Sequence, residues 1–219
     1  MSLDLDEIFS GDRRIHANED LSQFSGAELV AGALRWALLD IQAEALRGSY
    51  TTQHNQSLIQ AIESATAIVN CPALRDASDD DLAPWRTYVT SQRGSYALTL
   101  TGVPETPWRV GLVQMALVAL AGLTWRAALE AVQAVQQGSP AAVMERISRQ
   151  DAGRILEQLV VLGATSQVTR SEESGASTVD ERYARGEITR EEFLQLKQDL
   201  TEPEIAETRD APGGGLWGV

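Results

Sequence analysis

The alternation of apolar and polar positions is clearest between Tyr96 and Thr169, where its period changes several times. A period of two is typical of a strand with one buried face, and a spacing of three and four residues is typical of an amphipathic helix. The periods predict strand, helix, helix, strand, helix and strand, at residues 96–100, 108–120, 125–136, 143–147, from Ser148 to Gly163, and 165–169. We therefore expect an α+β fold in two layers, with a three-stranded sheet backed by three helices.

Residues that start and stop helices stand at the boundaries of these segments. Pro107 follows Thr106, and a proline after a capping side chain is a common helix start. Thr124 is placed to cap the next helix, and Ser148 with Asp151 three residues later resembles a capping box. Glycines that tolerate the left-handed conformation stop the helices, at Gly122, Gly138 and Gly163.

Helical periodicity also fills residues 25–92. Ser25 and Glu28 form a capping-box pattern before a helix that reaches Arg47. A second helix begins at Thr51 or Thr52 and ends at Cys71-Pro72, and a third begins at the acidic run 79–81. Apolar residues cover most of the circumference of the first helix. A few helices rarely bury so wide a stripe alone, so this region is expected to pack on the central domain or to self-associate as a dimer.

Residues 1–24 form an acidic lead-in without a clear period. The sequence favours a loosely docked arm. The alternative is an arm anchored to a neighbouring element by its apolar residues, which are Leu3, Leu5, Ile8 and Phe9.

Residues 178–200 carry a short, dense pattern that predicts two helices in a hairpin. Gly186 ends the first helix, and Thr189 with Glu192 forms a capping box for the second. The apolar positions make one seam, at Val179, Tyr183, Ile188, Phe193, Leu196 and Leu200. The pattern resembles the short C-terminal (SHOCT) domain, a helical hairpin appended to many bacterial proteins. The resemblance implies oligomerisation or docking through the seam, because so short a hairpin is marginal alone.

The hairpin is flanked by polar stretches. Residues 170–177 are small and polar, as in a flexible linker. Residues 201–219 are acidic and then glycine-rich up to Leu216-Trp217-Gly218-Val219. The composition predicts a disordered tail in which Trp217 is incidental. The alternative is that Trp217 is an anchor on a tether, because tryptophan is a frequent binding hot spot.

The central segment also shares short stretches, in order, with one known family. They are Val110-Gly111-Leu112-Val113, Gly122-Leu123, Arg126-Ala127-Ala128, Val132, Gly138-Ser139-Pro140-Ala141-Ala142-Val143, Ile147-Ser148, Asp151-Ala152 and Leu162-Gly163-Ala164. In the order of their predicted elements and in these short stretches of sequence, residues 96–169 resemble the C-terminal domain of the bacterial ribosomal stalk protein, which recruits translational GTPases. The first helix here has about one residue more than the family pattern.

In that family the first two helices present a basic face to acidic GTPases. Arg109 and Arg126 match family basic positions, whereas apolar or amide residues stand at others, at Gln114 or Met115, Leu117 or Val118, and Leu129. The resemblance therefore implies the same scaffold with an altered binding face, since lost positive charge lowers encounter rate and discrimination. The same scaffold resembles the adaptor that feeds substrates to a bacterial protease, so docking by this fold is not confined to the ribosome.

The candidate partner-binding residues follow from these two resemblances. They are Trp108, Arg109, Gln114, Leu117, Trp125 and Arg126 in the central domain and Phe193, Leu196, Leu200 and Trp217 beyond it. Trp108 and Trp125 open the two helices of the docking face, where they either contact a partner or complete the core. Arg146, Arg149 and Arg154 form a cluster that meets an acidic partner, meets the chain's own acidic tail, or is a solvated face, which the sequence favours.

Charge limits the classes of partner. Apolar residues are 43% and charged residues 22% of 219 residues, with a net charge of −13. Residues 93–170 carry 7 basic and 5 acidic residues, against 6 and 14 in residues 1–92 and 5 and 12 in residues 171–219. This balance disfavours nucleic acid and anionic membranes as partners. The acidic start lacks the basic region of a secretory signal, and Val110 to Leu123 is too short to span a bilayer, which predicts a cytoplasmic protein.

Catalytic patterns are missing from the sequence. Cys71 is single and His16 and His54 are far apart, so neither a disulfide framework nor a zinc site is predicted. Cys71 is expected to be a packed small hydrophobe and both histidines to be polar surface residues. Gly213-Gly214-Gly215 lacks the Lys-Ser/Thr of a phosphate-binding loop. We therefore predict a protein that is not an enzyme and needs no cofactor or metal.

Together these patterns predict five parts: a helical region that can dimerise, a stalk-like α/β domain, a linker, a hairpin and a tail. Their ranges are 1–92, 93–169, 170–177, 178–200 and 201–219. The predicted function is to bind other proteins as an adaptor or assembly component. The alternative is a factor that associates with the ribosome or with a translational GTPase. A third class is structural self-assembly into homo-oligomers.

Overall fold

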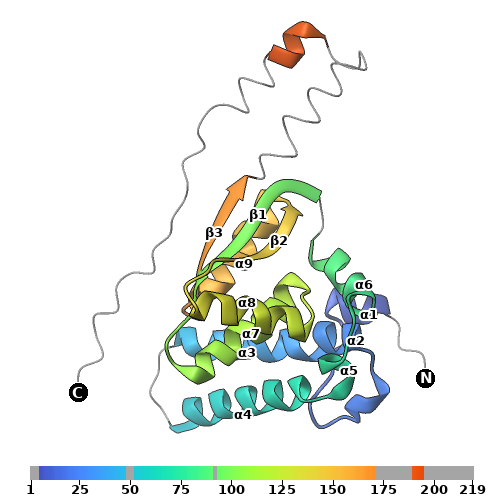
Figure 1. Ribbon diagram of the computed structural model, residues 1–219. Coiled ribbons are helices and arrows are strands. Elements are labelled where there is room, and N and C mark those ends of the chain that lie inside the picture. Colours follow the sequence, from blue (N-terminus) through green and yellow to red (C-terminus); the bar gives the residue numbers. More distant parts are fainter. Residues whose placement is uncertain (1–4, 48–51, 91–92, 171–188, 195–219) are drawn as a thin grey trace.

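The computed structural model describes residues 5–47, 52–90, 93–170 and 189–194 (Figure 1). Its architecture is mixed α+β, mostly helical with one three-stranded antiparallel sheet. The helices before the sheet are α1 (Leu5–Ser10), η1 (Leu21–Gln23), α2 (Gly26–Leu29), η2 (Val30–Leu34), α3 (Arg35–Arg47), α4 (Thr52–Val69), α5 (Pro72–Arg75) and α6 (Asp79–Val89). The α/β part contains β1 (Arg93–Gly102), α7 (Pro107–Ala121), α8 (Trp125–Gln136), β2 (Ala141–Ile147), α9 (Arg149–Val161) and β3 (Thr165–Arg170).

The order of the α/β elements is the predicted one, and the sheet has the order β2-β1-β3 with both pairs antiparallel. The strands are longer than the alternation of apolar residues indicated, because backbone hydrogen bonding between strands continues beyond the last alternating residue. β1 begins three residues before Tyr96, across an irregularity that Gly94 permits. A Cβ on Gly94 would lie 2.1 Å from the Ile147 carbonyl oxygen, so only glycine allows this approach.

Most of the predicted helix boundaries are confirmed by hydrogen bonds. Ser25 and Glu28 form a complete capping box, and Thr124 and Ser148 each accept a backbone N–H three residues later. Gly122 closes α7 with a φ of 68°. Thr106 precedes α7 but makes no side-chain capping bond, so its predicted capping role is wrong.

The lead-in is not a loosely docked arm, and that prediction is corrected. Ile8 in α1 is 1% exposed and Ile15 is 2% exposed. Both side chains pack against Gly32 in the π-helical segment η2, where a Cβ would come within 2.8 Å of Ile15. Phe9 stacks on Tyr88 with ring centroids 5.3 Å apart. The described part of the lead-in therefore belongs to the core, held by apolar residues whose spacing is too irregular to show a period, whereas Leu3 lies outside the described residues.

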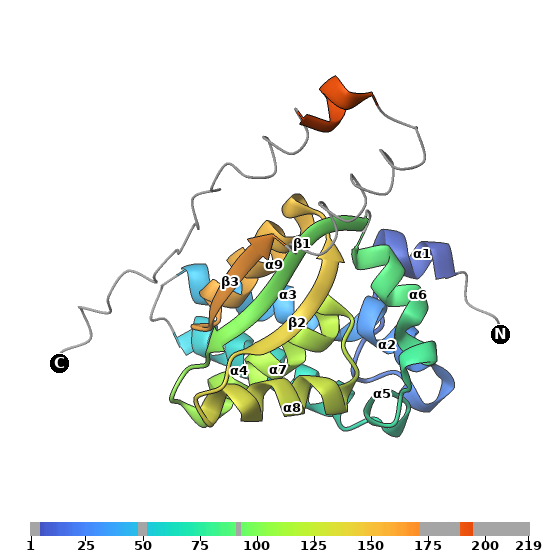
Figure 2. The ribbon, with the colours of Figure 1, turned by 45° about the horizontal axis from the view of Figure 1, so that its top comes forward.

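The layers explain where the first 90 residues pack. In Figure 1 the sheet lies above α7 and α8, α3 lies at about the height of α7, and α4 lies lowest. Figure 2 shows the opposite face of the sheet without a helix in front of it. α7 contacts α8 and α9 and also η2, α3 and α6, so it is shared between the two parts. Packing of the helical region on the α/β part is thus confirmed, and self-association stays a prediction.

Three polar contacts join α6 to the α/β part. The indole N–H of Trp85 donates to the Ala119 carbonyl at 2.9 Å. Arg86 donates to the Gly122 carbonyl at 2.8 Å, and Arg154 donates to the Val89 carbonyl at 2.6 Å. One cluster of buried apolar side chains runs from Ile8 to Ala164 through both parts. That residues 1–92 and 93–169 are separate domains, each able to fold alone, stays a prediction.

Candidate docking surfaces

The first turn of α7 presents an aromatic ring and a cation to solvent. Trp108 is 49% exposed, and the Cζ atom of Arg109 lies 5.3 Å from its ring centroid. Gly111 lies three residues on, along the same side of the helix, and a Cβ there would meet nothing within 4 Å. The turn therefore offers a large apolar surface beside a charged donor, with open space next to it. This is the composition of a protein-binding hot spot.

Farther along α7 the predicted docking face is corrected. Gln114 is 7% exposed and Leu117 is fully buried. Met115 and Val118, which take these two places if the additional residue of the helix is aligned differently with the stalk family, are 8% and 0% exposed. Either alignment therefore places buried residues on the predicted face. The physical reason is that α7 is covered on one side by α8 and α9 and on the other by η2 and α3. A helix that is apolar all round is a buried helix, and the run from Val110 to Leu123 carried that signal.

The other predicted residues of this face lie at the start of α8. Arg126 is exposed and pairs with Glu130 at 2.9 Å, whereas Trp125 is half-buried against the core. Leu129 is 37% exposed. Because α8 begins where α7 ends, the length of α7 separates Trp108 from Arg126 by about 20 Å. The predicted residues therefore form two separate patches, one at each end of the α7–α8 pair.

The hairpin residues are described only in part. The backbone N–H of Thr189 donates to Glu192 at 2.8 Å and the N–H of Glu192 donates to the Thr189 hydroxyl at 3.2 Å, which confirms the capping box. Phe193 is half-buried, and Leu194 beside it is 55% exposed. Leu196, Leu200 and Trp217 lie outside the described residues.

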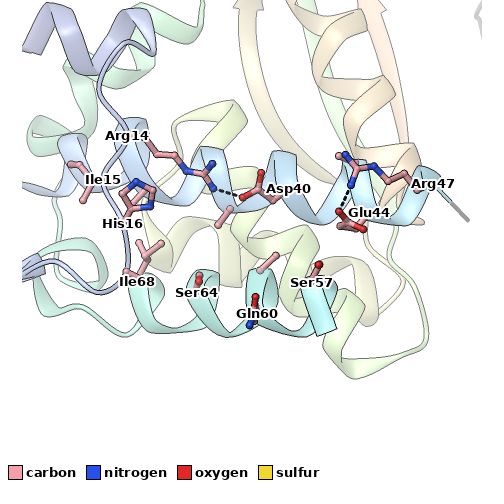
Figure 3. Close-up of a pocket in the computed structure, with 15 residues that line it drawn as sticks. Arg14, Ile15, His16, Asp40, Glu44, Arg47, Ser57, Gln60, Ser64 and Ile68 are labelled. Carbon is pink, nitrogen blue, oxygen red and sulfur yellow. Dashed lines mark hydrogen bonds and ion pairs between the residues drawn. The ribbon is translucent and has the colours of Figure 1, made fainter. Parts of the chain in front are cut away.

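A groove between α3 and α4 was not foreseen from the sequence (Figure 3). Its volume is about 350 Å³. Alanines and Ile68 line its base, and uncharged polar side chains from α4 line one wall, namely Ser57, Gln60 and Ser64. The sequence feature that could have indicated the groove is the recurrence of small residues every three or four positions on α4. This pattern is equally typical of close helix packing.

The charged residues of the groove neutralise one another. Arg14 pairs with Asp40 at one end, and Glu44 pairs with Arg47 at 2.5 Å at the other. Glu44 also contacts Nδ1 of His54 at 2.8 Å. His54 is thus half-buried beside the Glu44–Arg47 ion pair, and its predicted surface position is wrong. To an occupant, the groove offers hydroxyl and amide groups from α4, and the arginines and carboxylates that line its described walls are paired with one another.

The remaining sequence candidates have structural positions. Cys71 is 8% exposed and packs as a small hydrophobe, as predicted. Arg154 is not simply solvated, because it holds the Val89 carbonyl and lies 3.4 Å from Asp151. In the described part of the chain, no three His, Cys, Asp or Glu side chains come together as a metal site. None of the described helices combines the length and the apolar character needed to cross a membrane.

The predicted hairpin matches a known family. Residues 178–200 match the family described as the Short C-terminal domain. The matched segment is the one whose capping box and seam predicted a SHOCT hairpin. No curated protein and no solved structure matches the chain. A small domain of this family supports a protein-interaction or adaptor-like role for this part of the chain.

Proposed function

We propose that this protein is a non-enzymatic adaptor that binds other proteins through two modules, the first turn of α7 and the hairpin 178–200. The observation that carries the proposal is Trp108, a 49% exposed indole under a guanidinium, on a helix whose residues 112–119 are all buried. Exposing this ring on an otherwise covered helix leaves a large apolar area in water, and burial against a partner would remove it. The match to the Short C-terminal domain supports a second interaction module.

The test is a quantitative pull-down from the native host with the full-length chain. The variants are Trp108→Ala, Phe193→Asp and the control Val161→Ala, which shortens an apolar side chain that is 41% exposed on α9. If Trp108 is a hot spot, its truncation lowers recovery of one partner set by about 30-fold. Phe193→Asp removes a different set, and Val161→Ala changes neither. Equal recovery with wild type and Trp108→Ala contradicts the proposal for α7.

The second candidate function is a factor that binds the ribosome or a translational GTPase through a stalk-like domain. The β-α-α-β-α-β order and the exposed Arg109 and Arg126 favour it. In its support, each arginine lies at one end of the α7–α8 pair, where an acidic partner can reach it. Co-sedimentation with ribosomes or elongation factor at moderate salt, lost in Arg109→Glu or Arg126→Glu, is the expected result. Retained co-sedimentation in both variants, or none with wild type, removes this candidate.

Structural self-assembly is the third class of function, and the full-length chain and its Phe193→Asp variant distinguish it from the other two. A self-assembling chain forms oligomers whose mass in light scattering grows with concentration, and Phe193→Asp would dissolve them because it places a charge in the hairpin seam. An adaptor keeps a constant mass in the absence of its partner.

A further inference from the structure

The groove between α3 and α4 has the cross-section of a binding site for a small molecule. Its volume of about 350 Å³ lies near the lower end of the range for ligand sites in proteins. Figure 3 shows α3 along one wall and α4 along the other, with Arg14 and His16 of the lead-in at one end. Small or apolar buried side chains form the floor between the walls, namely Ala33, Ala37, Ala61 and Ile68. An occupant therefore meets an apolar floor and two polar walls.

The wall from α4 carries neutral hydrogen-bonding groups. Ser57, Gln60 and Ser64, which we call the α4 row, are spaced by three and four residues and so follow one side of the helix over about 10 Å. The Ser57 hydroxyl donates to the Gln53 carbonyl at 3.1 Å and keeps its acceptor lone pairs. Within the described segments, the side chains of Gln60 and Ser64 make no hydrogen bond to the protein. The α4 row thus offers both donors and acceptors along its length.

The opposite wall carries charges that are already paired. Arg14 pairs with Asp40, and Arg47 pairs with Glu44 at 2.5 Å. A charged ligand gains little here, because each of these charges has a partner of opposite sign. The Asp40 carboxylate uses Oδ2 in its pair, and Oδ1 has no partner among the described residues. A neutral hydroxyl group can accept from the guanidinium and donate to this free oxygen while the pair stays intact.

We propose that the groove binds a neutral polyhydroxylated small molecule, either a linear polyol or a short oligosaccharide. The carbon skeleton of such a molecule lies on the apolar floor, and its hydroxyl groups reach the α4 row and the Arg14–Asp40 pair. A hydroxyl group both donates and accepts, so it suits two walls that offer donors and acceptors together. None of these residues belongs to the two modules of the proposed adaptor, so binding here does not depend on that function.

The test is a titration of the isotope-labelled full-length chain, followed through backbone amide chemical shifts in NMR. Maltose and sorbitol are the neutral probes and distinguish an oligosaccharide from a linear polyol. Glucose 6-phosphate, spermidine and glutamine are the anionic, cationic and zwitterionic probes. We expect at least one neutral probe to shift amides of residues 33–47 and 57–68 saturably, with a dissociation constant of about 1 mM. Melting temperature is no substitute, because polyols stabilise proteins by being excluded from their surfaces.

Two matched pairs of variants locate the binding. Ala43 and Ala45 are both exposed on α3, but only Ala43 lines the groove. Ala43→Phe fills the groove and should weaken binding at least about 10-fold, whereas Ala45→Phe should leave it unchanged. Gln60→Ala removes a hydrogen-bonding side chain of the α4 row and should raise the dissociation constant about 2- to 10-fold. Its control is Gln56→Ala, one turn earlier on α4 and outside the groove lining.

The proposal holds if maltose or sorbitol binds saturably at these amides and each groove variant binds it more weakly than its control. It is overturned if neither neutral probe shifts these amides, or if a charged or zwitterionic probe binds more tightly than both. It is also overturned if Ala43→Phe and Ala45→Phe bind alike. Amide spectra outside α3 and α4 show whether each variant is folded. If Ala43→Phe is not, the comparison of Gln60→Ala with Gln56→Ala decides the outcome.

Discussion

Trp85 is the residue on which the joint between the helical region and the α/β part depends. Its side chain is fully buried and stacks on Tyr88 with ring centroids 5.4 Å apart. Its N–H donates to the Ala119 carbonyl near the end of α7. That carbonyl lacks its usual helical donor, because the Leu123 N–H bonds to Leu117 instead. Trp85 therefore fills space between two parts of the chain and also satisfies an orphan helix carbonyl.

The expected cost of removing Trp85 follows from these contacts. Trp85→Ala leaves a cavity and an unpaired carbonyl, and we expect it to lower the free energy of unfolding by about 3–5 kcal/mol. Trp85→Phe keeps most of the apolar contact but leaves the Ala119 carbonyl without a donor, which costs about 1–3 kcal/mol. Trp108→Ala is the matched control. Its ring is 49% exposed, so truncation removes only part of the contact area and should cost clearly less than Trp85→Ala, about 1–2 kcal/mol.

The assay is urea unfolding followed by far-ultraviolet circular dichroism, combined with amide hydrogen exchange. A single transition is expected, with α3 and β1 exchanging through the same global opening, because one cluster of buried side chains includes both. The reasoning is refuted if Trp85→Ala costs no more than Trp108→Ala. It is equally refuted if the amides of residues 26–89 exchange through an opening that leaves residues 93–170 protected.

Three further predictions concern stability. Gly111→Ala and Gly153→Ala should each stabilise the fold by about 0.5–1 kcal/mol, since both glycines are helical and have open space at Cβ. Gly26→Ala should destabilise the fold, because its Cβ would lie 2.7 Å from that of Ala77. Melting temperatures of the three variants decide the signs. Arg154→Met should cost about 1–2 kcal/mol in urea unfolding, because the Val89 carbonyl loses its donor, and Arg75→Met should cost less than about 0.5 kcal/mol. Hydrogen bonds from Arg13 to Glu19 and from Ser78 to Asp81 hold the pKa values of these carboxyls below their usual range. The two ionised carboxylates therefore stabilise the folded state fully above about pH 4 to 5, the pKa range of the unfolded chain, and this stabilisation is lost as the pH falls through their lower pKa values in the folded state. The urea midpoint should therefore drop in acid, and it should fall less steeply with pH in Glu19→Gln.

Local signals were enough for most of the longer elements of this fold, although the short helices α1 and α5 were not predicted. The helix starts at Ser25, Thr124 and Ser148 were readable because capping depends on side chains within three residues. The stop at Gly122 was readable because the left-handed conformation favours glycine. The order of strands and helices followed from changes of period. These features are decided by near neighbours in the chain, which a sequence displays directly.

Features decided by distant residues were misjudged or missed. Gln114 is polar but buried, and only the packing of η2 and α3 on α7 makes it so. Ile8 and Ile15 looked like parts of a loose arm because their partner is Gly32, which shows no pattern that could announce it. His54 is half-buried because it contacts Glu44, ten residues away on the preceding helix. Gln114 and His54 were errors about the face that an element presents, whereas in the lead-in the helix α1 itself was missed.

The shared position of α7 limits how this protein can bind a partner. A docking face that runs along two helices needs both of them exposed, and here residues 112–119 of α7 are closed off by the helical region. What remains is the Trp108 end and the Arg126 end, about 20 Å apart. One small partner surface cannot bury both ends at once. For the proposed adaptor, the partner must therefore be large enough to span them, or each end serves a different contact, and residues 178–200, which match the Short C-terminal domain, would supply a further one.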